Sequence, residues 1–541
     1  MTETNHVPPK TLQKYEKVWP NKTILDYLKQ CVENSPNKEA IIDGRSRYTY
    51  SELSKKVERV ALGLYHYGLR KGDVISVQLP NWNEFVIVHY AATMLGAITN
   101  PLIPIYRDRE IGYMVKTASS KMIVIPDHFR GFCYTDMIER LRGDWPELDH
   151  VFVIGDEVPG EMKAFTELAE VNWEDTLDHQ SLETTHDPND VTEIIFTSGT
   201  TGLPKGVMHT HNTLCMSTNY WIERLRLTDE DVMFMPSTFG HQTGFGYGVR
   251  LPTTIGGTAV YQDIWNPEQF LQSVEKERIT FTASATPFLQ DVVQFENVKS
   301  FNLKTLRAFV SLGAPIPRAL VKEAKENVPF TILSGWGQTE NGLVTLTKLN
   351  DSTEKLTETD GCPFPGMMIK TVDENGNECE ANEEGSLLVK GPALFIGYLH
   401  QPELTASEFT DDWFITGDRA TIDVDGYVRI TGRDKDIIIR GGENIPVAYI
   451  ENVLYEHPDI KGAQVVAVPD ERLQEKACAI VELVPKASHL TLNKLQSYLK
   501  DKGVAKQYWP EYLEVIEEFP RTPSGKVQKY KLRDMLKTKA N

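Results

Sequence analysis

The sequence has few cysteines, and their spacing argues against the sites that cysteines usually build. The six cysteines in 541 residues lie far apart, and no two have the CxxC spacing of a zinc or redox site. A small disulfide scaffold needs many cysteines in a short chain, so it is not indicated either. We expect reduced cysteines and a cytoplasmic protein.

Long hydrophobic runs are also scarce. The first residues, MTETNHVPPKTLQKYEKVW, lack the apolar core of a signal peptide, and the final KTKAN is not a peroxisomal tripeptide. The stretch 85–106 has no charge, but it contains His89, Asn100, Pro101 and Pro104. We therefore predict a buried helix followed by a buried strand there, and no integral membrane segment.

Positive charge is in deficit. Lys and Arg number 57 and Asp and Glu 76, which gives a net charge of −19. Phosphate repulsion makes broad nucleic-acid binding improbable for such a chain, so we expect no nucleic-acid partner. A phosphorylated ligand would have to be bound by hydrogen-bond donors and positive charges gathered at one site.

The composition and pattern are those of a globular α/β protein. Apolar residues make up 40% and charged residues 25%, and the length implies at least two hydrophobic cores. Apolar runs at 74–79, 122–125, 151–154 and 194–196 alternate with helical stretches such as 50–67, which predicts layered α/β sheets with largely parallel strands.

The alternation of apolar strands and helices gives way to short strands near residue 410. Short strands are predicted at 413–416, 421–423 and 427–431, with a hairpin turn at Asp425-Gly426. A charged stretch then leads to a compact α+β unit. We predict a large N-terminal domain over 1–433 that includes a β-rich subdomain, and a small mobile C-terminal domain over 434–541. The smaller part holds 17 Lys and Arg against 16 Asp and Glu, so the acidity belongs to the larger part.

The strongest local signal is the loop TSGTTGLPKG, which follows a predicted strand directly. Its hydroxyls can donate to phosphate oxygens, its glycines let backbone amides approach an anion, and Lys205 adds a positive charge. Pro204 and Gly206 flank that lysine, so the loop is not a Walker A motif, in which the lysine begins a helix. The glycines at 244, 246 and 248 have the wrong spacing for a dinucleotide fingerprint.

This loop resembles the phosphate-binding motif of the adenylate-forming superfamily, which includes acyl-CoA synthetases, nonribosomal peptide adenylation domains and firefly-type luciferases. Further motifs resemble the family in the same order along nearly the whole chain: GWGQTE at 335–340, TGD at 416–418, GRDKD at 432–436, RGGEN at 440–444 and PRTPSGK at 520–526. The earlier YTYSEL at 48–53 and MLGA at 94–97 also resemble it.

The resemblance implies an ATP site that uses Mg²⁺. Glu340 is similar to the family's Mg²⁺-binding carboxylate and Lys526 to its catalytic lysine; alone, either would be read as a surface charge. Asp418 would accept hydrogen bonds from the ribose hydroxyls, because two carboxylate oxygens suit a vicinal diol. The expected ATP-binding and catalytic set further comprises Thr197, Ser198, Gly199, Thr200, Thr201, Gly202, Lys205, Gly313, Ala314, Pro315, Gly335, Trp336, Gly337, Gln338, Thr339 and Arg433.

The family forms an acyl-adenylate and then a thioester at one site, and these two half-reactions imply a hinge. In the family the C-terminal domain rotates, and Lys435 lies where relatives place the hinge residue. The resemblance implies that Gly441, Gly442 and Glu443 then line a coenzyme A tunnel. Trp336 is expected to stack on adenine, with a core position as the alternative.

The acyl pocket is less well defined. Relatives restricted to acetate have a tryptophan where this chain has Gly337, so we expect that glycine to leave volume for a larger acid. Thr238, His241, Phe288 and Ser311 are further candidates, and a core role for His241 is the alternative. No basic residue in these segments awaits a second acidic or amino group. The sequence therefore favours a medium-chain, branched, alicyclic or aromatic acid.

The predicted activity is that of an AMP-forming acid–CoA ligase with ATP, Mg²⁺ and coenzyme A. An enzyme that loads a carrier protein is the alternative, although no carrier module follows residue 541. A non-catalytic nucleotide-binding protein would be expected to lose Lys526 or Glu340, and a P-loop phosphotransferase would need a Walker A frame. The expected partners are small molecules, and the oligomeric state is open, with a homodimer among the alternatives.

Overall fold

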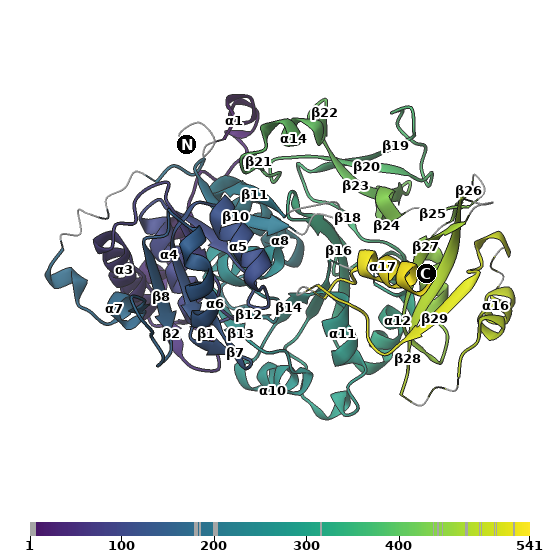
Figure 1. Cartoon of the computed structure of the whole chain (residues 1–541), viewed down its shortest axis with the longest axis horizontal. Coiled ribbons are helices and arrows are strands. Elements are labelled where there is room, and N and C mark those ends of the chain that lie inside the picture. Colours follow the sequence, from purple (N-terminus) through teal and green to yellow (C-terminus); the bar gives the residue numbers. More distant parts are fainter. Residues whose placement is uncertain are drawn as a thin grey trace.

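The computed structural model describes residues 7–177, 182, 186–197, 204–313, 316–436, 438–440, 443–445, 447–470, 474–485, 487, 489–502, 504, 506–522 and 525–540. Figure 1 shows the N-terminal part (purple to teal) at one end, a green β-rich sheet above its border, and the C-terminal part (yellow) at the other end.

Two large sheets form the N-terminal part. In the described chain one has the strand order β21-β11-β10-β4-β3-β5-β8-β9 and the other β18-β17-β16-β15-β14-β12-β13-β1-β2. The first comprises β21 (Gly397–Tyr398), β11 (Lys205–Thr210), β10 (Val191–Thr197), β4 (Ile98–Pro101), β3 (Val74–Val77), β5 (Ser120–Pro126), β8 (His150–Ile154) and β9 (Lys163–Ala164). The second comprises β18 (Cys362–Pro363), β17 (Gly342–Leu346), β16 (Thr331–Gln338), β15 (Ala308–Ser311), β14 (Phe281–Ser284), β12 (Val232–Met235), β13 (Thr258–Tyr261), β1 (Glu39–Ile42) and β2 (Arg47–Thr49).

Helices separate and cover these sheets. The α-helices are α1 (Pro9–Tyr15), α2 (Ile24–Asn34), α3 (Tyr50–His66), α4 (Asn83–Met94), α5 (Asp108–Thr117), α6 (Tyr134–Leu141), α7 (Thr166–Ala169), α8 (His211–Leu225), α9 (Leu251–Ile255), α10 (Pro267–Glu277), α11 (Thr286–Val293), α12 (Arg318–Asn327), α13 (Thr353–Glu358) and α14 (Pro402–Ser407). A π-helix, Thr243–Arg250, precedes α9. Short 3₁₀ turns lie at Arg142–Asp144, Trp173–Asp175 and Val298–Ser300, and β6 (His128–Phe129) pairs with β7 (Phe132–Cys133).

Local sequence explains where several elements begin. Helix α3 starts after Thr49, whose hydroxyl accepts from the Glu52 amide while the Glu52 carboxylate accepts from the Thr49 amide. Its first buried side chains, Tyr50, Leu53, Val57 and Val60, are three to four residues apart, and the helix is then buried on all sides over 60–64. The uncharged stretch 85–106 forms α4 and then β4, and both are buried. The predicted helix and strand are confirmed.

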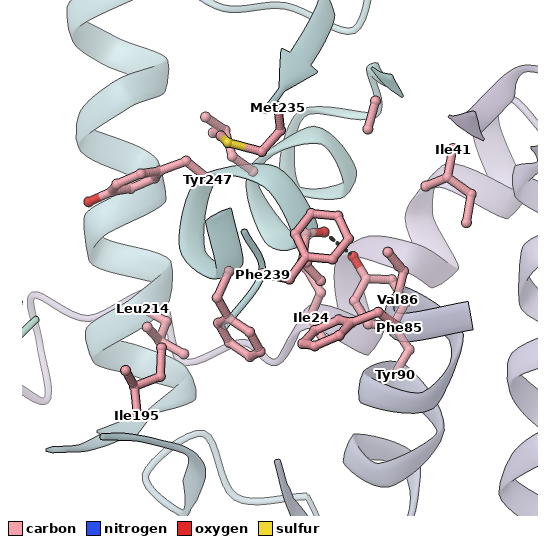
Figure 2. Close-up of a cluster of buried hydrophobic side chains, with 14 of the residues drawn as sticks. Ile24, Ile41, Phe85, Val86, Tyr90, Ile195, Leu214, Met235, Phe239 and Tyr247 are labelled. Atoms are coloured by element: carbon pink, nitrogen blue, oxygen red, sulfur yellow. Dashed lines mark hydrogen bonds between the residues drawn. The ribbon is translucent and has the colours of Figure 1, made fainter. Parts of the chain in front are cut away.

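The core lies between the layers. Phe85 on α4 packs against Phe239 with ring centroids 5.1 Å apart, and Figure 2 shows these rings beside Tyr90 and below the π-helix that carries Tyr247. Burying aromatic side chains of this size contributes about 1.5–3 kcal/mol each. The same cluster includes Trp336 and Leu343 on the strands that carry the site.

A third sheet covers the border with the C-terminal part. It consists of β19 (Met368–Val372), β20 (Gly385–Lys390), β23 (Trp413–Ile422), β22 (Phe409–Thr410) and β24 (Val428–Arg433). The predicted hairpin at Asp425-Gly426 joins β23 and β24. Two strands predicted before it form one, because β23 continues through Gly417 along β20.

The C-terminal part has its own sheet and core. A 3₁₀ turn, Asp434–Asp436, separates β24 from β25 (Ile438–Arg440). The remaining elements are β26 (Glu443–Ile445), α15 (Val447–Tyr455), β27 (Ile460–Asp470), β28 (Gln474–Leu483), α16 (Leu492–Asp501), a 3₁₀ turn at Lys506–Tyr508, β29 (Tyr512–Ile516) and α17 (Lys529–Ala540). Their core is formed by residues such as Ile450, Val465 and Leu495.

Candidate adenylation site

The candidate site begins at the carboxyl ends of parallel strands. Ser284 and Ser311 end β14 and β15, and Ser334 stands in register with them within β16. Loops that follow parallel strands meet at one edge of a sheet, where α/β proteins bind ligands. Leu312-Gly313 therefore leaves the sheet beside Gly335-Trp336, which continue β16 and pair with β17.

The glycine-rich loop connects an antiparallel hairpin. Thr197 ends β10 and pairs with Lys205 at the start of β11. The hairpin fixes both ends of the loop at the edge of the first large sheet. Several predicted site residues lie outside the described part of the chain: Ser198, Gly199, Thr200, Thr201, Gly202, Ala314, Pro315, Gly441 and Gly442.

Asp418 is the centre of a polar cluster. Its Oδ2 accepts from Trp336 Nε1 at 2.8 Å and from Gln338 Nε2 at 3.0 Å. Its Oδ1 lies 2.8 Å from Arg433 Nε, across the β23–β24 pair. The residue is 3% exposed, so these partners replace the water that a carboxylate normally holds.

Arg433 is held by the same carboxylate. The Asp418 charge raises the pKa of Arg433, which keeps the guanidinium charged. Its side chain remains 45% exposed, so it can reach a further anion. The ribose-binding role of Asp418 and the phosphate-binding role of Arg433 remain predictions.

Glu340 lies in the turn between β16 and β17. Burial raises the pKa of its carboxyl group, while the Tyr398 hydroxyl, which donates to Oε1 at 3.0 Å, and the Lys205 charge act in the opposite direction. Its backbone carbonyl accepts from the Phe395 amide at 2.7 Å. The sequence offered no reason to join Glu340 to Tyr398.

His209 forms a hydrogen bond with the backbone of this turn. Its Nε2 is 2.7 Å from the Thr339 carbonyl oxygen, which can only accept, so Nε2 carries the proton. Burial lowers the pKa of His209 to about 4, and the ring is neutral at pH 7. Gln338 donates its amide to Asn341 Oδ1 at 2.6 Å, which closes the turn. His209 was not among the predicted site residues.

Lys526 reaches the N-terminal part from the C-terminal part. A Cβ placed on Gly313, where φ is +82°, would lie 3.6 Å from Lys526 Cε. Burial and the Arg433 charge lower the pKa of Lys526 to about 8, although Asp418 and Glu340 oppose this. Figure 1 shows the yellow segment before α17 extending toward β14 and β16. The structure therefore brings Lys526 together with the predicted nucleotide residues.

His241 also lies within reach of the Lys526 charge, and it is hydrogen-bonded to Thr238. Burial and the Lys526 charge lower the pKa of His241 to about 3, so its ring is neutral. Its Nδ1 accepts from the Thr243 amide at 3.3 Å, and its own amide donates to the Thr238 carbonyl at 3.1 Å. These bonds orient the ring at the start of the π-helix.

The expectation of open volume at Gly337 is wrong. A Cβ there would lie 1.9 Å from the Gly342 carbonyl oxygen and 2.9 Å from Leu343 Cα. The β16–β17 pairing shifts register between Trp336 and Gly337, which presses the returning strand against this glycine. The backbone of β17 fills the position where relatives would have a side chain.

The remaining acyl-pocket candidates differ in their surroundings. Ser311 is fully buried, and its hydroxyl is 3.4 Å from that of Thr286. Phe288 packs edge-on against Trp265 at 4.9 Å, beside the outer core under α10 and α11. These contacts give Phe288 a packing role, and its place in the pocket stays a prediction.

The hinge and coenzyme A candidates flank the border between the two parts. Lys435 lies in the 3₁₀ turn and Glu443 in β26. Beside Lys435, Asp434 Oδ1 accepts from Ser386 at 3.4 Å and lies 3.6 Å from Arg419 Nη1. Gln290 donates to the Lys461 carbonyl at 3.4 Å. Such weak, exposed contacts cost little to break.

The described part of the chain contributes few metal ligands. Among the residues that the structure describes, no group of three or more His, Cys, Asp or Glu could hold a metal ion. The Glu340 carboxylate, with a hydrogen bond from Tyr398 on Oε1, fits a hard cation that keeps water and phosphate oxygens as its other ligands. Nor is any described helix both long and apolar enough to cross a bilayer.

Comparison with known proteins gives a consistent result. The AMP-binding enzyme model matches residues 28–399, and the model of the AMP-binding enzyme C-terminal domain matches 449–526. The chain is 36% identical over 522 residues to a medium-chain fatty-acid–CoA ligase of Escherichia coli, covering 96% of this chain and 91% of that protein. It is 30% identical to the mitochondrial medium-chain acyl-CoA ligase of Bos taurus, covering 96% and 88%.

Its fold is similar to that of the anthranilate CoA ligase AuaEII, solved in complex with anthranoyl-AMP. The TM-score is 0.89 at 24% identity, covering 97% of this chain and 99% of that one. The ordered motifs, the match over most of the chain and the shared fold agree: the chain belongs to the AMP-binding enzymes of the adenylate-forming superfamily.

Proposed function

We propose that the protein is an ATP-dependent acid–CoA ligase that forms acyl-CoA, AMP and pyrophosphate through an acyl-adenylate. The observation that carries this proposal is the placement of Lys526 beside Gly313, where the charges of Arg433, Asp418 and Glu340 all act on it. One mobile lysine thus meets the predicted ribose, phosphate and metal residues. The medium-chain ligases among its relatives support the same activity.

In the first half-reaction a carboxylate oxygen attacks the α-phosphorus and the bond to pyrophosphate breaks. Lys526 bridges the α-phosphate and the attacking carboxylate, which neutralises charge and holds the reactants in line. Asp418, oriented by Trp336 and Arg433, binds the ribose hydroxyls. Thr197 and Lys205 bind the outer phosphates with the loop between them. Bound Mg²⁺ would neutralise charge on the phosphate oxygens beside Glu340.

In the second half-reaction the coenzyme A thiol attacks the acyl carbonyl and AMP leaves. Rotation about Lys435 withdraws Lys526 and brings the segment 441–443 to the site. The contacts that Asp434 makes beside the hinge are long and weak, which suits such a motion. The same site then serves two reactions in turn.

The proposed substrate is an unfunctionalised acid of medium size. His241 is neutral, so the wall that it forms with Thr238 offers no fixed charge to a second carboxylate. The two medium-chain ligases support this size class. Cytoplasmic location, fatty acid metabolism and the oligomeric state remain predictions of the sequence.

Pyrophosphate release over a panel of acids, with and without coenzyme A, tests the proposal. We expect sustained turnover only with coenzyme A and fastest with unfunctionalised acids of medium size, the class that the two medium-chain relatives support. Sustained release without coenzyme A for every acid would reject the ligase activity. Transfer to a phosphopantetheinylated carrier but not to coenzyme A would favour the carrier-loading alternative.

A further inference from the structure

Tyr398 lies between the two charged groups expected to act on the triphosphate. Its hydroxyl donates to Glu340 Oε1 at 3.0 Å, and Lys205 Nζ stands 4.7 Å from the centre of its ring. One side chain thus contacts a carboxylate through its edge and a cation through its face. Both contacts use the parts of a tyrosine that attract those charges.

The backbone of Tyr398 is fixed from several directions. Its amide donates to Thr405 Oγ1 at 2.9 Å, and the residue pairs with Val207 across β11 and β21. The next amide, at Leu399, donates to the Gly206 carbonyl at 2.8 Å. These bonds tie Tyr398 to the strand that begins with Lys205. The ring is 3% exposed and packs against Phe395.

Glu340 is tied to the same segment. Its carbonyl accepts from Phe395, three residues before Tyr398. Lys205 also pairs with Glu408 at 2.9 Å, with both side chains about a quarter exposed. An ion pair exposed to this degree contributes little and yields readily to a ligand. The buried ring of Tyr398 is the more permanent support of the lysine.

We propose that Tyr398 is a positioning residue that sets Glu340 and Lys205 at a fixed distance and orientation. The inference rests on the proposed function, in which Glu340 faces Mg²⁺ and Lys205 faces phosphate. The hydroxyl holds the carboxylate that would bind Mg²⁺, and the ring holds the ammonium that would bind phosphate. Tyr398 thus acts through Glu340 and Lys205.

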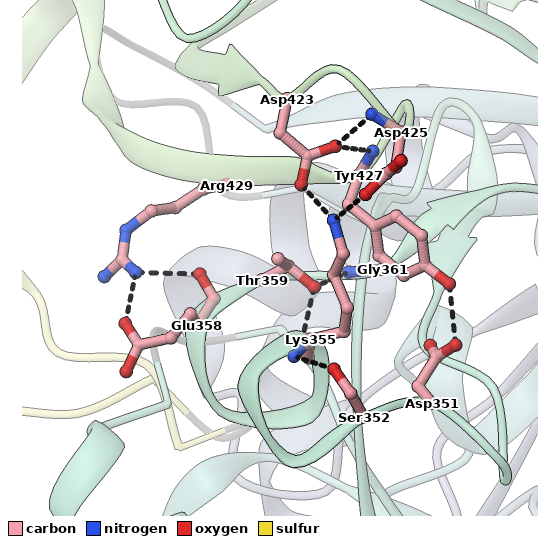
Figure 3. Close-up of polar contacts among 10 residues, drawn as sticks. All are labelled: Asp351, Ser352, Lys355, Glu358, Thr359, Gly361, Asp423, Asp425, Tyr427 and Arg429. Carbon is pink, nitrogen blue, oxygen red and sulfur yellow. Dashed lines mark hydrogen bonds and ion pairs between the residues drawn. The ribbon is translucent and has the colours of Figure 1, made fainter.

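The first test is Tyr398→Phe, which removes the hydroxyl and keeps the ring. Tyr427→Phe is the matched control, because the Tyr427 hydroxyl also donates to a carboxylate, Asp351 Oδ1 at 2.7 Å, in the separate network of Figure 3. The readout is ATP affinity by calorimetry, measured with EDTA and then with Mg²⁺.

We expect Tyr398→Phe to leave the metal-free affinity within twofold of wild type. The affinity for ATP with Mg²⁺ should fall about ten- to hundredfold, the effect of one hydrogen bond to a charged group. Tyr398→Leu should also weaken the metal-free affinity, because it removes the ring under Lys205. The control should change neither value. Equal losses with and without Mg²⁺, or no loss at all, would overturn the proposal.

A double-mutant cycle excludes a general loss of structure. In a Glu340→Gln background, Tyr398→Phe should produce no further Mg²⁺-dependent loss, since the carboxylate that it orients is gone. An undiminished loss there would overturn the positioning role. Failure of the proposed function has a different signature: wild-type protein would form no AMP from any acid, whatever the binding data.

Discussion

Trp336 and Asp418 are joined directly, by a hydrogen bond of 2.8 Å from the indole N–H to the carboxylate. The sequence assigned them to two different parts of a nucleotide, yet they form one unit at the junction of β16 and β23. Trp336 is 8% exposed and belongs to the main core, so the core position considered as an alternative also applies. Its indole links the core to the site.

The change Trp336→Phe tests this link. The ring survives but the donor is lost, which leaves a buried carboxylate with one partner fewer. We expect the KM for ATP to rise about tenfold or more, because a hydrogen bond to a charged group contributes about 1.5–3 kcal/mol. Trp145→Phe is the control, as its indole donates to the Gly112 carbonyl far from the site. An unchanged KM in Trp336→Phe would show that Asp418 needs no such support.

Replacing Lys526 should separate the half-reactions. In Lys526→Ala we expect acyl-adenylate formation to fall about 10²–10³-fold, as for the loss of one positioned charge in a transition state. Thioester formation from supplied acyl-adenylate should stay within a fewfold of wild type. Single-turnover assays of each step measure this. Equal losses in both steps would contradict the two-state hinge.

The pH dependence of adenylation should follow Lys526. Its lowered pKa of about 8 means that the required ammonium is present below pH 8 and is lost as the pH rises through that value. We expect kcat/KM for ATP, which reports the free enzyme, to fall about tenfold per pH unit above pH 8. Lys526→Arg stays charged, so its profile should be flat there. The same fall in that variant would assign the titration to another group.

Replacing Gly337 by any residue with a side chain should destabilise the protein. Because a Cβ would lie 1.9 Å from the Gly342 carbonyl, Gly337→Ala must move the backbone of β17. We expect a loss of about 3 kcal/mol or more in the free energy of unfolding, measured in urea. Gly143→Ala, whose Cβ would meet nothing within 4 Å, is the control. A stable Gly337→Trp with a preference for acetate would restore the open-volume interpretation.

Local patterns predicted much of the fold. Apolar runs became the parallel strands β3, β5, β8 and β10, and the Thr49–Glu52 capping pair starts α3 as such a pair should. Strand β24 ends at Arg433, and the domain boundary placed there stays a prediction. These features depend on neighbours within a few residues, which a sequence displays directly.

Contacts between distant segments could not be predicted in the same way. Tyr398 is 58 residues from Glu340, and Glu408 is 203 residues from Lys205. The only available signal for Tyr398 was its place in a Gly-Tyr pair shortly before a proline-led helix. The lack of room for a side chain at Gly337 could not be predicted for another reason. It arises from a register shift between β16 and β17, which residue types do not encode.

The sequence by itself determined the family, the α/β layering and the residues that carry the proposed chemistry, because each motif is a short run whose residue types are dictated by what it binds. Only the tertiary structure decided how those residues support one another. It placed Lys526 against Gly313, ran β17 across the position expected to be open, and joined Glu340 to Lys205 through Tyr398. Close packing decides such relationships, and it depends on the whole chain at once.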